Sequence, residues 1–385
     1  MSRRCVSNKV CFVITDAISF NYLCRGQLEY FRDHGLDLTL VCGGGADELN
    51  KLSQRKVGQV LHIGLVRKPS LFRDVLAFFQ LLAIFVRNRY ALVVYSTPKA
   101  LLLGAVAAFL ARQPHRVALI RGRVYENMSG VARWIYCQAD KLACGLSNRV
   151  LFISRSLLEC FVLENIVPEA KAHVLGQGSS NGVDLSKFNR SSASSDRIRC
   201  RQELGLSPSD FVLLVAGRLC RDKGIEDVRE VVHLLKSRSD IRFVLVGVVE
   251  DGSAKAFLRE FENDSRVLYV EPQDTLGQLM GAADLHLFLT HREGFGNVAI
   301  EAAACGLPTL AYNVVGVRDS VCDGVSGKLF EFGDVVGVAE YISAYSVDVE
   351  GFYSKYTGAS KWAVDHFGQK SVWQHYVDFY RLGLN

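Results

Sequence analysis

The feature that most constrains the fold of this 385-residue chain is a repeated alternation between short apolar runs and longer segments of helical character. Such alternation is typical of parallel sheets with helices on both faces, and 385 residues exceed what one hydrophobic core usually organises. The sequence therefore predicts two doubly wound α/β domains. The predicted strands are 9–14, 36–42, 59–63, 92–95, 117–121 and 150–153 in the first half, and 211–217, 242–248, 266–270, 285–289 and 328–330 in the second.

A polar, turn-rich stretch separates the two halves. Residues 176–188 are rich in Gly, Ser and Asn, and residues 190–196 are almost entirely small and polar. Such composition is typical of a connection that packs against neither domain. We therefore expect a first domain at 1–188, a linker at 189–200 and a second domain at 201–367.

Residues 285–308 contain the strongest candidates for functional residues. In this segment an apolar run is followed by a glycine-containing loop and a predicted apolar helix. Asn297 is the predicted N-cap of this helix, and Gly306 its predicted end. Glu301 is the only charge in the helix, and a carboxylate in apolar surroundings costs several kcal/mol unless donors satisfy it. Glu293 lies eight residues earlier, in the loop at the carboxyl end of the strand, where open α/β sheets bind ligands.

A second loop has the composition of a phosphate site. The apolar run 211–217 ends at Gly217 and is followed by a basic loop that contains Arg218 and Lys223. Gly224 then begins a predicted helix. A strand, a basic glycine-bearing loop and a helix N-terminus together present positive charge and free N–H groups to an anion.

These two stretches resemble the donor site of retaining GT-B glycosyltransferases, which have two Rossmann-like domains facing across a cleft. The resemblance rests on Glu293 and Glu301, spaced as Glu-x7-Glu, and on the Gly-Arg and Lys-Gly pairs at 217–218 and 223–224. It implies that Glu293 contacts the donor sugar, that Glu301 holds the ribose and that Arg218 and Lys223 hold the diphosphate. Glu293, Arg218 and Lys223 are thereby the predicted catalytic residues. It further implies donor contacts from Gly217, Gly294, Phe295, Gly296 and Asn297, and a last helix, about 368–385, that returns to the first domain.

The loops after the strands of the first half carry basic residues, and the carboxyl ends of parallel strands meet at one edge of a sheet. Arg25, Lys99, Arg121 and Arg123 are predicted to form a cradle for the diphosphate of an acceptor. Residues 97–99, 121–122 and 125–126 resemble GT-B enzymes that build bacterial surface polysaccharides (O-antigen or capsule) on undecaprenyl diphosphate. Many members of the family have His where Arg121 stands, so the catalytic contact on the acceptor side stays unassigned.

The net charge of +5 is unevenly distributed. Residues 1–195 carry 25 Lys and Arg against 13 Asp and Glu, whereas residues 196–385 carry 20 against 27. A basic first half indicates an anionic partner, and we expect a membrane surface or a phosphorylated acceptor rather than nucleic acid, since no nucleic-acid-binding motif is present. The all-apolar segment 75–86 is too short to span a bilayer. It is either a buried helix or a helix in the membrane interface, and the two alternatives are compatible.

The eleven cysteines are scattered, no Cys-x-x-Cys pair occurs, and residues 1–4 lead directly into a strand-like run without a secretory leader. These features predict a reduced chain in the cytoplasm, associated peripherally with the inner face of the membrane. The histidines lack ligand spacing, and no Asp-x-Asp follows a predicted strand. We therefore expect no metal and no cofactor, with the Arg218 and Lys223 side chains in the role of a metal ion.

The resemblance implies transfer of a hexose or N-acetylhexosamine from a nucleoside-diphosphate sugar, UDP-linked, to a lipid-diphosphate-linked saccharide, with retention of configuration. Two alternatives remain open at this point. A sugar-nucleotide epimerase can share the two-domain architecture, and a non-catalytic module could bind a nucleotide or a membrane. A dehydrogenase is disfavoured because no Gly-x-Gly-x-x-Gly follows the first predicted strand.

Overall fold

The computed structural model describes residues 8–68, 70–272 and 275–382, and the side chains of these residues except 191–196. The predicted leaderless start at residues 1–4 and the last three residues of the predicted final helix lie outside the described residues. The chain divides into two compact units. Unit 1 comprises residues 1–181 and 370–385, and unit 2 comprises residues 182–369.

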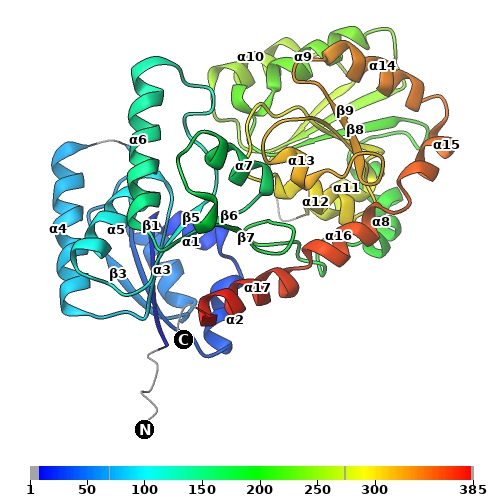
Figure 1. Ribbon diagram of the computed structural model, residues 1–385. Coiled ribbons are helices and arrows are strands. Elements are labelled where there is room, and N and C mark those ends of the chain that lie inside the picture. Colours follow the sequence, from blue (N-terminus) through cyan, green and yellow to red (C-terminus); the bar gives the residue numbers. More distant parts are fainter. Residues whose placement is uncertain (1–7, 69, 273–274, 383–385) are drawn as a thin grey trace. The chain divides into compact units, whose positions relative to one another are not determined.

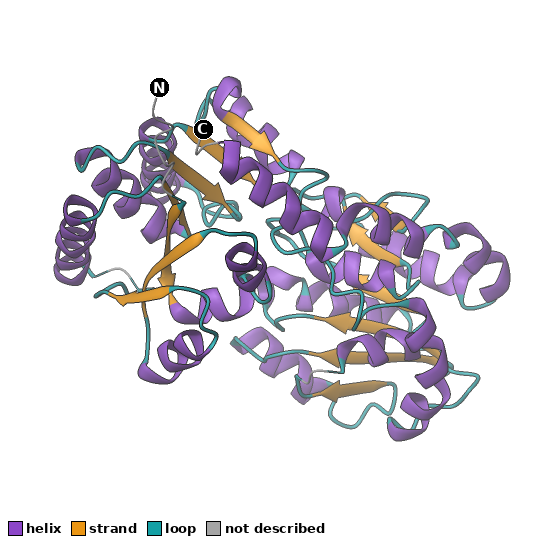
Figure 2. Cartoon of the chain, turned by 90° about the horizontal axis from the view of Figure 1, so that it is seen from below, coloured by secondary structure: helices purple, strands orange, loops and turns teal. Residues whose placement is uncertain are grey.

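Unit 1 is built on a seven-stranded, all-parallel sheet in the order β3-β2-β1-β4-β5-β6-β7 (Figure 1). Helices cover both faces of the sheet (Figure 2). The elements are β1 Lys9–Asp16, α1 Ala17–Leu23, α2 Gln27–Asp33, β2 Asp37–Gly43, α3 Ala46–Gln54, β3 Gln59–His62, α4 Leu71–Arg87, β4 Leu92–Ser96, α5 Pro98–Leu110, β5 Arg116–Ile120, α6 Gly130–Leu146, β6 Arg149–Phe152, α7 Arg155–Leu163, β7 Ala172–Val174 and, from the chain end, α17 Gln369–Leu382.

Unit 2 has a six-stranded, all-parallel sheet in the order β10-β9-β8-β11-β12-β13. The two sheets confirm the predicted class of two parallel α/β domains. The elements are α8 Arg190–Glu203, β8 Phe211–Ala216, the 3-10 turn η2 Arg221–Lys223, α9 Ile225–Leu234, β9 Ile241–Val246, α10 Gly252–Glu260, β10 Val267–Val270, α11 Leu276–Ala282, β11 Leu285–Phe288, α12 Asn297–Ala304, β12 Thr309–Tyr312, α13 Val317–Ser320, β13 Gly327–Phe330, α14 Val335–Tyr345, α15 Val349–Tyr353 and α16 Ala359–Phe367.

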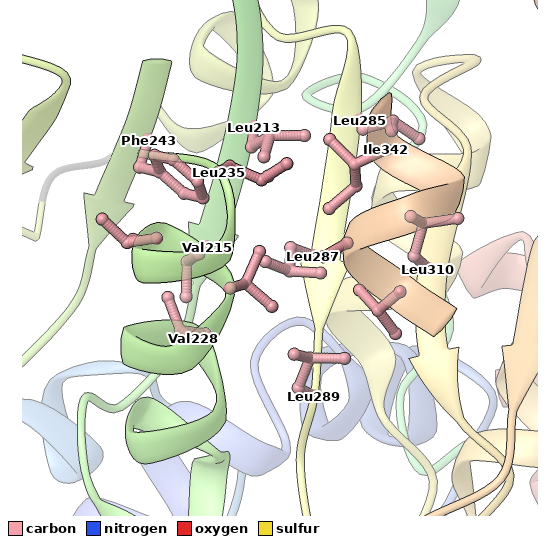
Figure 3. Packing of buried hydrophobic residues seen from close by; sticks show 14 of the residues in the cluster. Leu213, Val215, Val228, Leu235, Phe243, Leu285, Leu287, Leu289, Leu310 and Ile342 are labelled. Carbon is pink, nitrogen blue, oxygen red and sulfur yellow. The ribbon is translucent and has the colours of Figure 1, made fainter. Parts of the chain in front are cut away.

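Strand β8 lies in the interior of the unit 2 sheet and is buried on both faces. Leu213 and Val215 point to the side covered by α9 and α14, where they pack with Leu287 and Ile342 (Figure 3). The intervening residues, such as Leu214, belong to a second core on the other face with α8, α11 and α12. Because both faces are buried, the strand reads as a continuous apolar run rather than as an alternating pattern.

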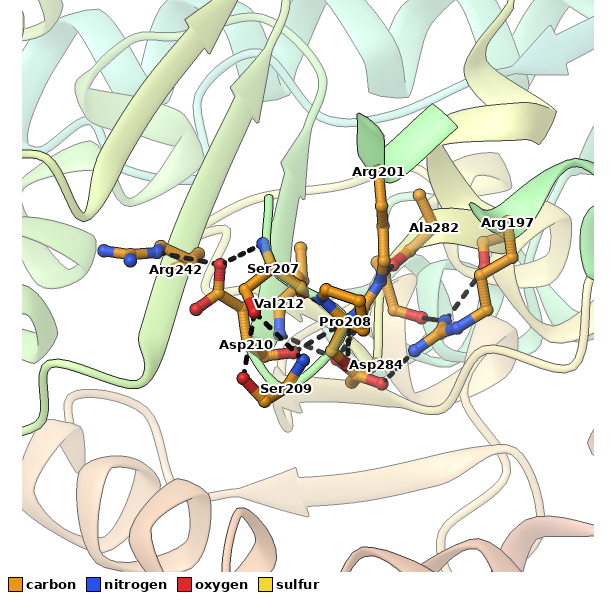
Figure 4. Close-up of polar contacts among 12 residues, drawn as sticks. Arg197, Arg201, Ser207, Pro208, Ser209, Asp210, Val212, Arg242, Ala282 and Asp284 are labelled. Carbon is orange, nitrogen blue, oxygen red and sulfur yellow. Dashed lines mark hydrogen bonds and ion pairs between the residues drawn. The ribbon is translucent and has the colours of Figure 1, made fainter. Parts of the chain in front are cut away.

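The predicted linker at 189–200 is wrong, because residues Arg190–Glu203 form helix α8 of unit 2. Two arginines of this helix dock on one buried carboxylate: Arg197 and Arg201 each lie 2.6 Å from an oxygen of Asp284 (Figure 4). Asp284 also accepts a hydrogen bond from the backbone N–H of Val212 at 2.7 Å. These tertiary contacts stabilise a helix that its serine-rich composition does not predict. The first crossing between the units falls at Asn181–Gly182 instead.

Helix α17, at the end of the chain, packs within unit 1. The Trp373 Nε1–H donates a hydrogen bond to Asn181 Oδ1 at 2.8 Å, and the Tyr30 hydroxyl donates to Gln374 at 2.7 Å. The ring of Tyr380 makes an edge contact with Phe31. The aromatic residues of α17 therefore pack in the interior of unit 1.

Three elements differ from the pattern that the sequence predicts. The pattern of residues 22–34 predicts one helix, but the helix found there, α2, begins only at Gln27, because Gly26 has a left-handed φ of +75° and packs against the ring of Trp373. Strands β7 and β12 were not predicted. β7 has only three residues, too few to produce a recognisable apolar run. β12 has four, as several predicted strands do, but its residues Thr-Leu-Ala-Tyr do not form an uninterrupted apolar run.

Among the described residues no helix is both long and apolar enough to cross a bilayer. The apolar segment 75–86 lies within α4, which has 17 residues. One side of α4 is buried through Ala77, Leu81 and Phe85, while other apolar residues of the same helix are exposed. Both alternatives that the sequence left open for this segment therefore remain compatible with the fold.

Candidate functional site

At the centre of the candidate site in unit 2, the Lys223 ammonium and the Glu293 carboxylate form an ion pair. Lys223 ends η2, which follows β8, and Glu293 lies in the loop after β11. β8 and β11 are neighbours in the sheet, so the loops at their carboxyl ends are adjacent. Both side chains are largely buried, with 18% and 19% exposed. The structure thus brings together two residues that the sequence predicted for catalysis.

Backbone contacts hold these two loops against each other. Gly224, at φ +77°, lies so close to the Leu289 carbonyl that a Cβ atom would be 1.8 Å from its oxygen. The backbone N–H of His291 donates to the carbonyl of Asp222 at 3.0 Å. No residue other than glycine fits at position 224 without moving one loop away from the other.

Two side-chain contacts add to this connection, and the sequence did not predict them. The Arg292 guanidinium lies 2.5 Å from Asp222, and the His291 ring nitrogen Nε2 lies 2.5 Å from Asp227 on α9. The only signal that could have found them is their position, because Asp222 directly precedes Lys223, and His291 and Arg292 directly precede Glu293. They connect the loops that carry Lys223 and Glu293.

Arg218 is the second predicted diphosphate ligand, and it follows Gly217 at the end of β8. Its guanidinium pairs with Glu250, the residue before Asp251 at the start of α10, and 52% of its side chain is exposed. Gly217, Arg218, Lys223 and Glu293 line the same small cavity. The predicted cationic loop and the first predicted carboxylate therefore share one concave surface.

Helix α12 carries Glu301, and its N-cap differs from the predicted one. The cap is Gly296, at φ +92°, and Asn297 is the first helical residue. A side chain at 296 would meet the Ser320 hydroxyl at 2.9 Å and the Phe288 ring at 3.0 Å, which explains why glycine replaces the usual polar cap. The prediction that Asn297 caps the helix is therefore wrong by one residue.

The Glu301 carboxyl has no hydrogen-bond or ion-pair partner in the described part of the chain. Burial raises the pKa of this carboxyl to about 8, and the nearby Asp184 carboxylate adds to the rise. A carboxyl in this environment is satisfied by groups that donate hydrogen bonds, such as the hydroxyls of a sugar or ribose. The geometry of Glu301 is consistent with the role that the resemblance implies.

Around Glu293 and Glu301, the loop residues have different environments. The Phe295 ring is 2% exposed and makes an edge contact with Phe367 of α16 at 5.4 Å between centroids. Its side chain therefore packs in the interior of unit 2 rather than lining the cavity. Gly294, by contrast, is only partly buried and lies close to Gly316, where an added Cβ atom would fall 2.8 Å from the Gly294 carbonyl carbon.

Two of the four cations predicted for the acceptor are neutralised by carboxylates of unit 1. Lys99 lies 2.7 Å from Asp74 on α4, and its ammonium also donates to the carbonyl of Lys68. Arg123 is 8% exposed and is paired with both Glu126 and Glu164, at 2.6 and 2.5 Å. Carboxylates of the same unit therefore already neutralise these two cations, and their part in the predicted cradle stays a prediction.

Arg121, the third of these cations, has a different environment. It follows β5 directly, and its Nε and Nη1 atoms are buried without a hydrogen-bond partner among the described residues. Its Nη2 contacts the Cys24 sulfur at 3.6 Å. A buried guanidinium without a carboxylate is costly, so this position favours an anionic ligand. Arg25, the fourth cation, is exposed, and its carbonyl accepts a hydrogen bond from Asn181.

In the described residues, no cluster of three or more His, Cys, Asp or Glu side chains has the arrangement of a metal site. The charges that face the unit 2 cavity are those of Arg218, Lys223 and Glu293. Two cations beside a carboxylate can hold a diphosphate and a polyol together, and they can stabilise the negative charge that develops on a phosphate leaving group.

Two family models match the chain. The model described as "Glycosyl transferases group 1" matches residues 196–349, and the model described as "Glycosyl transferase 4-like domain" matches residues 22–178. The first covers both loops of the unit 2 site, and the second covers Arg25, Lys99, Arg121 and Arg123. Because both models describe glycosyl transferases, they favour a transferase over the epimerase and over the non-catalytic module.

Similar proteins of established name extend this result to nearly the whole chain. The capsular polysaccharide biosynthesis glycosyltransferase CapM of Staphylococcus aureus is 29% identical over 369 residues, which cover 94% of each chain. The UDP-Gal:alpha-D-GlcNAc-diphosphoundecaprenol alpha-1,3-galactosyltransferase of Escherichia coli is 24% identical over 318 residues, which cover 80% of each chain.

Among solved structures, HepE of Anabaena in complex with UDP and glucose superposes with a TM-score of 0.79 at 21% identity. The superposition covers 97% of this chain and 99% of that chain. At this identity the likeness establishes the fold and not the substrate. The two parallel α/β units, the site at the strand ends of unit 2 and the two family models together identify the chain as a glycosyltransferase with the GT-B fold, in which residues 196–349 match the glycosyl transferases group 1 family.

Proposed function

We propose that this glycosyltransferase moves a hexose or N-acetylhexosamine from a UDP-linked donor to a saccharide carried on a lipid diphosphate, with retention of the anomeric configuration. The observation that carries the proposal is the Lys223–Glu293 pair beside Arg218, since it combines groups for a diphosphate and for sugar hydroxyls in one cavity. Support for the substrates comes from the names of the S. aureus and E. coli relatives and from the UDP and glucose in HepE.

On the donor side, the proposed role of each residue follows from its charge. Lys223 and Arg218 hold the two phosphates and compensate the charge that forms when the bond between the anomeric carbon and the diphosphate oxygen breaks. Glu293 accepts hydrogen bonds from the sugar hydroxyls and so fixes the ring, and Glu301 accepts hydrogen bonds from the ribose. The three side chains nearest the reacting bond are therefore Arg218, Lys223 and Glu293.

For the transfer step we propose attack on the face of the sugar from which the diphosphate leaves. A new bond forms between the anomeric carbon and an acceptor hydroxyl oxygen, and the proton of that hydroxyl moves to the departing diphosphate. No protein carboxylate is bonded to the sugar in this step. Retention then follows from the geometry of attack, and the protein contributes positions and charges.

On the acceptor side, Arg121 is the residue proposed to bind the lipid diphosphate. It is a buried cation whose Nε and Nη1 have no partner among the described residues, whereas Lys99 and Arg123 are paired with carboxylates. A diphosphate supplies several oxygen acceptors to one guanidinium. Arg25, which is exposed, is proposed as a second contact to the same diphosphate.

The test is an assay of the purified chain with a panel of UDP-hexoses and UDP-N-acetylhexosamines and a prenyl-diphosphate-linked saccharide. We expect one donor to be used, and we expect NMR of the product to show the anomeric configuration of that donor. Glu293→Gln should lower kcat/KM by about 100-fold, because a charged acceptor is lost at the reacting sugar. The matched control, Glu331→Gln, changes an exposed carboxylate of the same unit outside the cavity and should leave the rate unchanged.

An inverted product would refute retention, and a Glu293→Gln enzyme with full activity would refute the site. Isomerisation of the donor when acceptor is omitted would instead favour the epimerase. Transfer to a free saccharide as fast as to the diphosphate-linked one would refute the proposed acceptor class.

A further inference from the structure

Helix α4 of unit 1 is apolar on two opposite sides. Ala77, Leu81 and Phe85 recur every fourth residue and are buried. We call the opposite side the outer stripe of α4; it consists of exposed residues spaced by three, four or seven positions, which places them on one helical face. Its residues are Phe72, Val75, Leu76, Phe79 and Val86, with exposed fractions of 81%, 48%, 47%, 59% and 69%.

The position of the helix leaves this stripe uncovered within unit 1. α5 packs against α4 on one side and against α6 on the other. In Figure 1, α4 lies at the margin of unit 1. An amphipathic surface helix normally presents polar residues on its outer side, whereas α4 presents two phenylalanines there. The outer stripe therefore exposes a contiguous apolar surface to water, which is unfavourable unless something covers it.

Positive charge is concentrated in the part of the sequence that contains α4. Residues 63–125 contain ten Lys and Arg residues and one acidic residue, Asp74, which is paired with Lys99. Arg73 and Arg87 lie near the two ends of the stripe and Arg89 follows the helix. All three are exposed, and among the described residues they have no ion-pair partner. An apolar strip bordered by unpaired arginines is complementary to a surface that is anionic outside and apolar beneath.

We propose that the outer stripe of α4 lies in the interface of an anionic phospholipid bilayer, with Phe72 and Phe79 among the acyl chains and Arg73, Arg87 and Arg89 at the lipid phosphates. A helix of 17 residues in this orientation lies along the membrane and does not cross it. A second copy of the chain is disfavoured as the occupant of the stripe, because two surfaces of the same strong positive charge repel each other.

This inference goes beyond the proposed function, since it states where the enzyme contacts the membrane in which a lipid-linked acceptor resides. It involves neither the donor nor the acceptor. A test of membrane binding without either substrate therefore succeeds or fails independently of the proposed reaction.

The experiment is co-sedimentation of the full chain with vesicles of phosphatidylcholine alone and with vesicles in which phosphatidylglycerol replaces part of it. We expect binding to the anionic vesicles, weakened by salt. The double variant Phe72→Ser/Phe79→Ser should lower the partition coefficient by at least about 10-fold, because two exposed aromatic rings no longer enter the acyl region. Arg73→Gln/Arg87→Gln should lower binding to anionic vesicles and leave the weak binding to neutral vesicles unchanged.

The matched control is Leu163→Ser/Ile198→Ser, which removes two apolar side chains exposed to a similar extent, 80% and 72%, from α7 and α8. It should bind vesicles as the unmodified chain does. All variants change exposed residues, and thermal unfolding monitors their folding. Equal binding of the Phe72→Ser/Phe79→Ser variant, or binding to neutral and anionic vesicles alike, would overturn the proposal. Self-association that this double variant abolishes would also overturn it and would identify a second copy as the occupant.

Discussion

At the scale of single residues, the Lys223–Glu293 pair shows how one contact can serve two ligand groups. Each side chain is largely buried and each neutralises the other, so neither charge is exposed to solvent alone. Both also line the cavity to which Arg218 contributes. A ligand with a diphosphate next to a sugar offers an oxygen for the cation and hydroxyls for the carboxylate at one place.

Lys223→Ala should lower kcat by about 100- to 1,000-fold, since it removes a charge that stabilises the leaving diphosphate. The matched control is Arg221→Ala, which removes an exposed cation from the same 3-10 turn. Steady-state kinetics of both variants with the accepted UDP-sugar provides the measurement. Equal rates for the two variants would contradict the assignment of Lys223.

Arg121→Gln should raise KM for the lipid-diphosphate acceptor by about 10- to 100-fold and leave KM for the donor unchanged, because a charge-assisted hydrogen bond is lost. The same change should raise the midpoint of thermal unfolding, since a buried cation without a carboxylate is removed. Arg123→Gln is the contrasting variant. It breaks the pairs with Glu126 and Glu164 and should lower the midpoint. A lower midpoint for Arg121→Gln would identify that residue as structural.

The Glu301 carboxyl is expected to make the free energy of unfolding fall as the pH rises. Its pKa in the folded chain is about 8, above the usual value of 4.5, so the folded state binds more protons than the unfolded state between these values. The contribution of the protonated carboxyl to stability is therefore complete below about pH 4.5 and is lost as the pH rises through about 8. Glu301→Gln should match the unmodified chain at about pH 4 and exceed it by on the order of 5 kcal/mol at about pH 9.

Urea denaturation at these two pH values measures the difference. Glu331→Gln, at an exposed position of the same unit, is the control for the substitution itself. A Glu301→Gln variant with the same stability difference at both pH values would contradict the assigned environment of Glu301.

At the scale of elements, helix α8 depends on one buried carboxylate. Asp284→Asn would leave Arg201, which is 5% exposed, without its ionic partner in the interior. We expect a loss of about 3–5 kcal/mol in the free energy of unfolding, as for other broken buried pairs. Asp365→Asn breaks the exposed pair with Lys361 and should cost less than about 1 kcal/mol. Chemical denaturation of both variants measures the difference, and equal losses would refute a specific role of Asp284 in docking α8.

The same elements show what the sequence could predict and what it could not. The alternation of apolar runs predicted most strands, and the Glu293 and Lys223 loops were predicted because each follows such a run. Helix α8 was not predicted, because its stability comes from Asp284, 83 residues beyond Arg201, rather than from its own serines. The pairing of Lys99 and Arg123 was not predictable either, since Asp74 and Glu164 reach them only through the fold.

At the scale of the whole molecule, the chain passes between its two units twice, at 181–182 and 369–370. The unit 2 site is assembled from residues 217–301, all of which belong to one unit. The cations Arg25 and Arg121 belong to the other. The proposed donor and acceptor contacts are therefore encoded in separate parts of the chain.

Hydrogen exchange of the full chain should reflect this division. UDP at saturating concentration should slow exchange in residues 217–224 and 293–301, because ligand binding stabilises the segments that it contacts. Residues 121–126 should exchange as before. Uridine, which lacks the diphosphate, is the control and should protect residues 217–224 less than UDP does. Protection of 121–126 and not of 217–224 would reverse the proposed assignment of the two units.

The tight fit of Gly224 against the Leu289 carbonyl has a practical consequence for engineering. Since the backbones of Gly224 and Leu289 touch at this point, the turn with Lys223 and the segment with Glu293 cannot move closer to each other. The sugar preference should therefore be changed by substituting side chains in these two segments. An insertion or deletion in either segment would separate the Lys223 ammonium from the Glu293 carboxylate and abolish turnover.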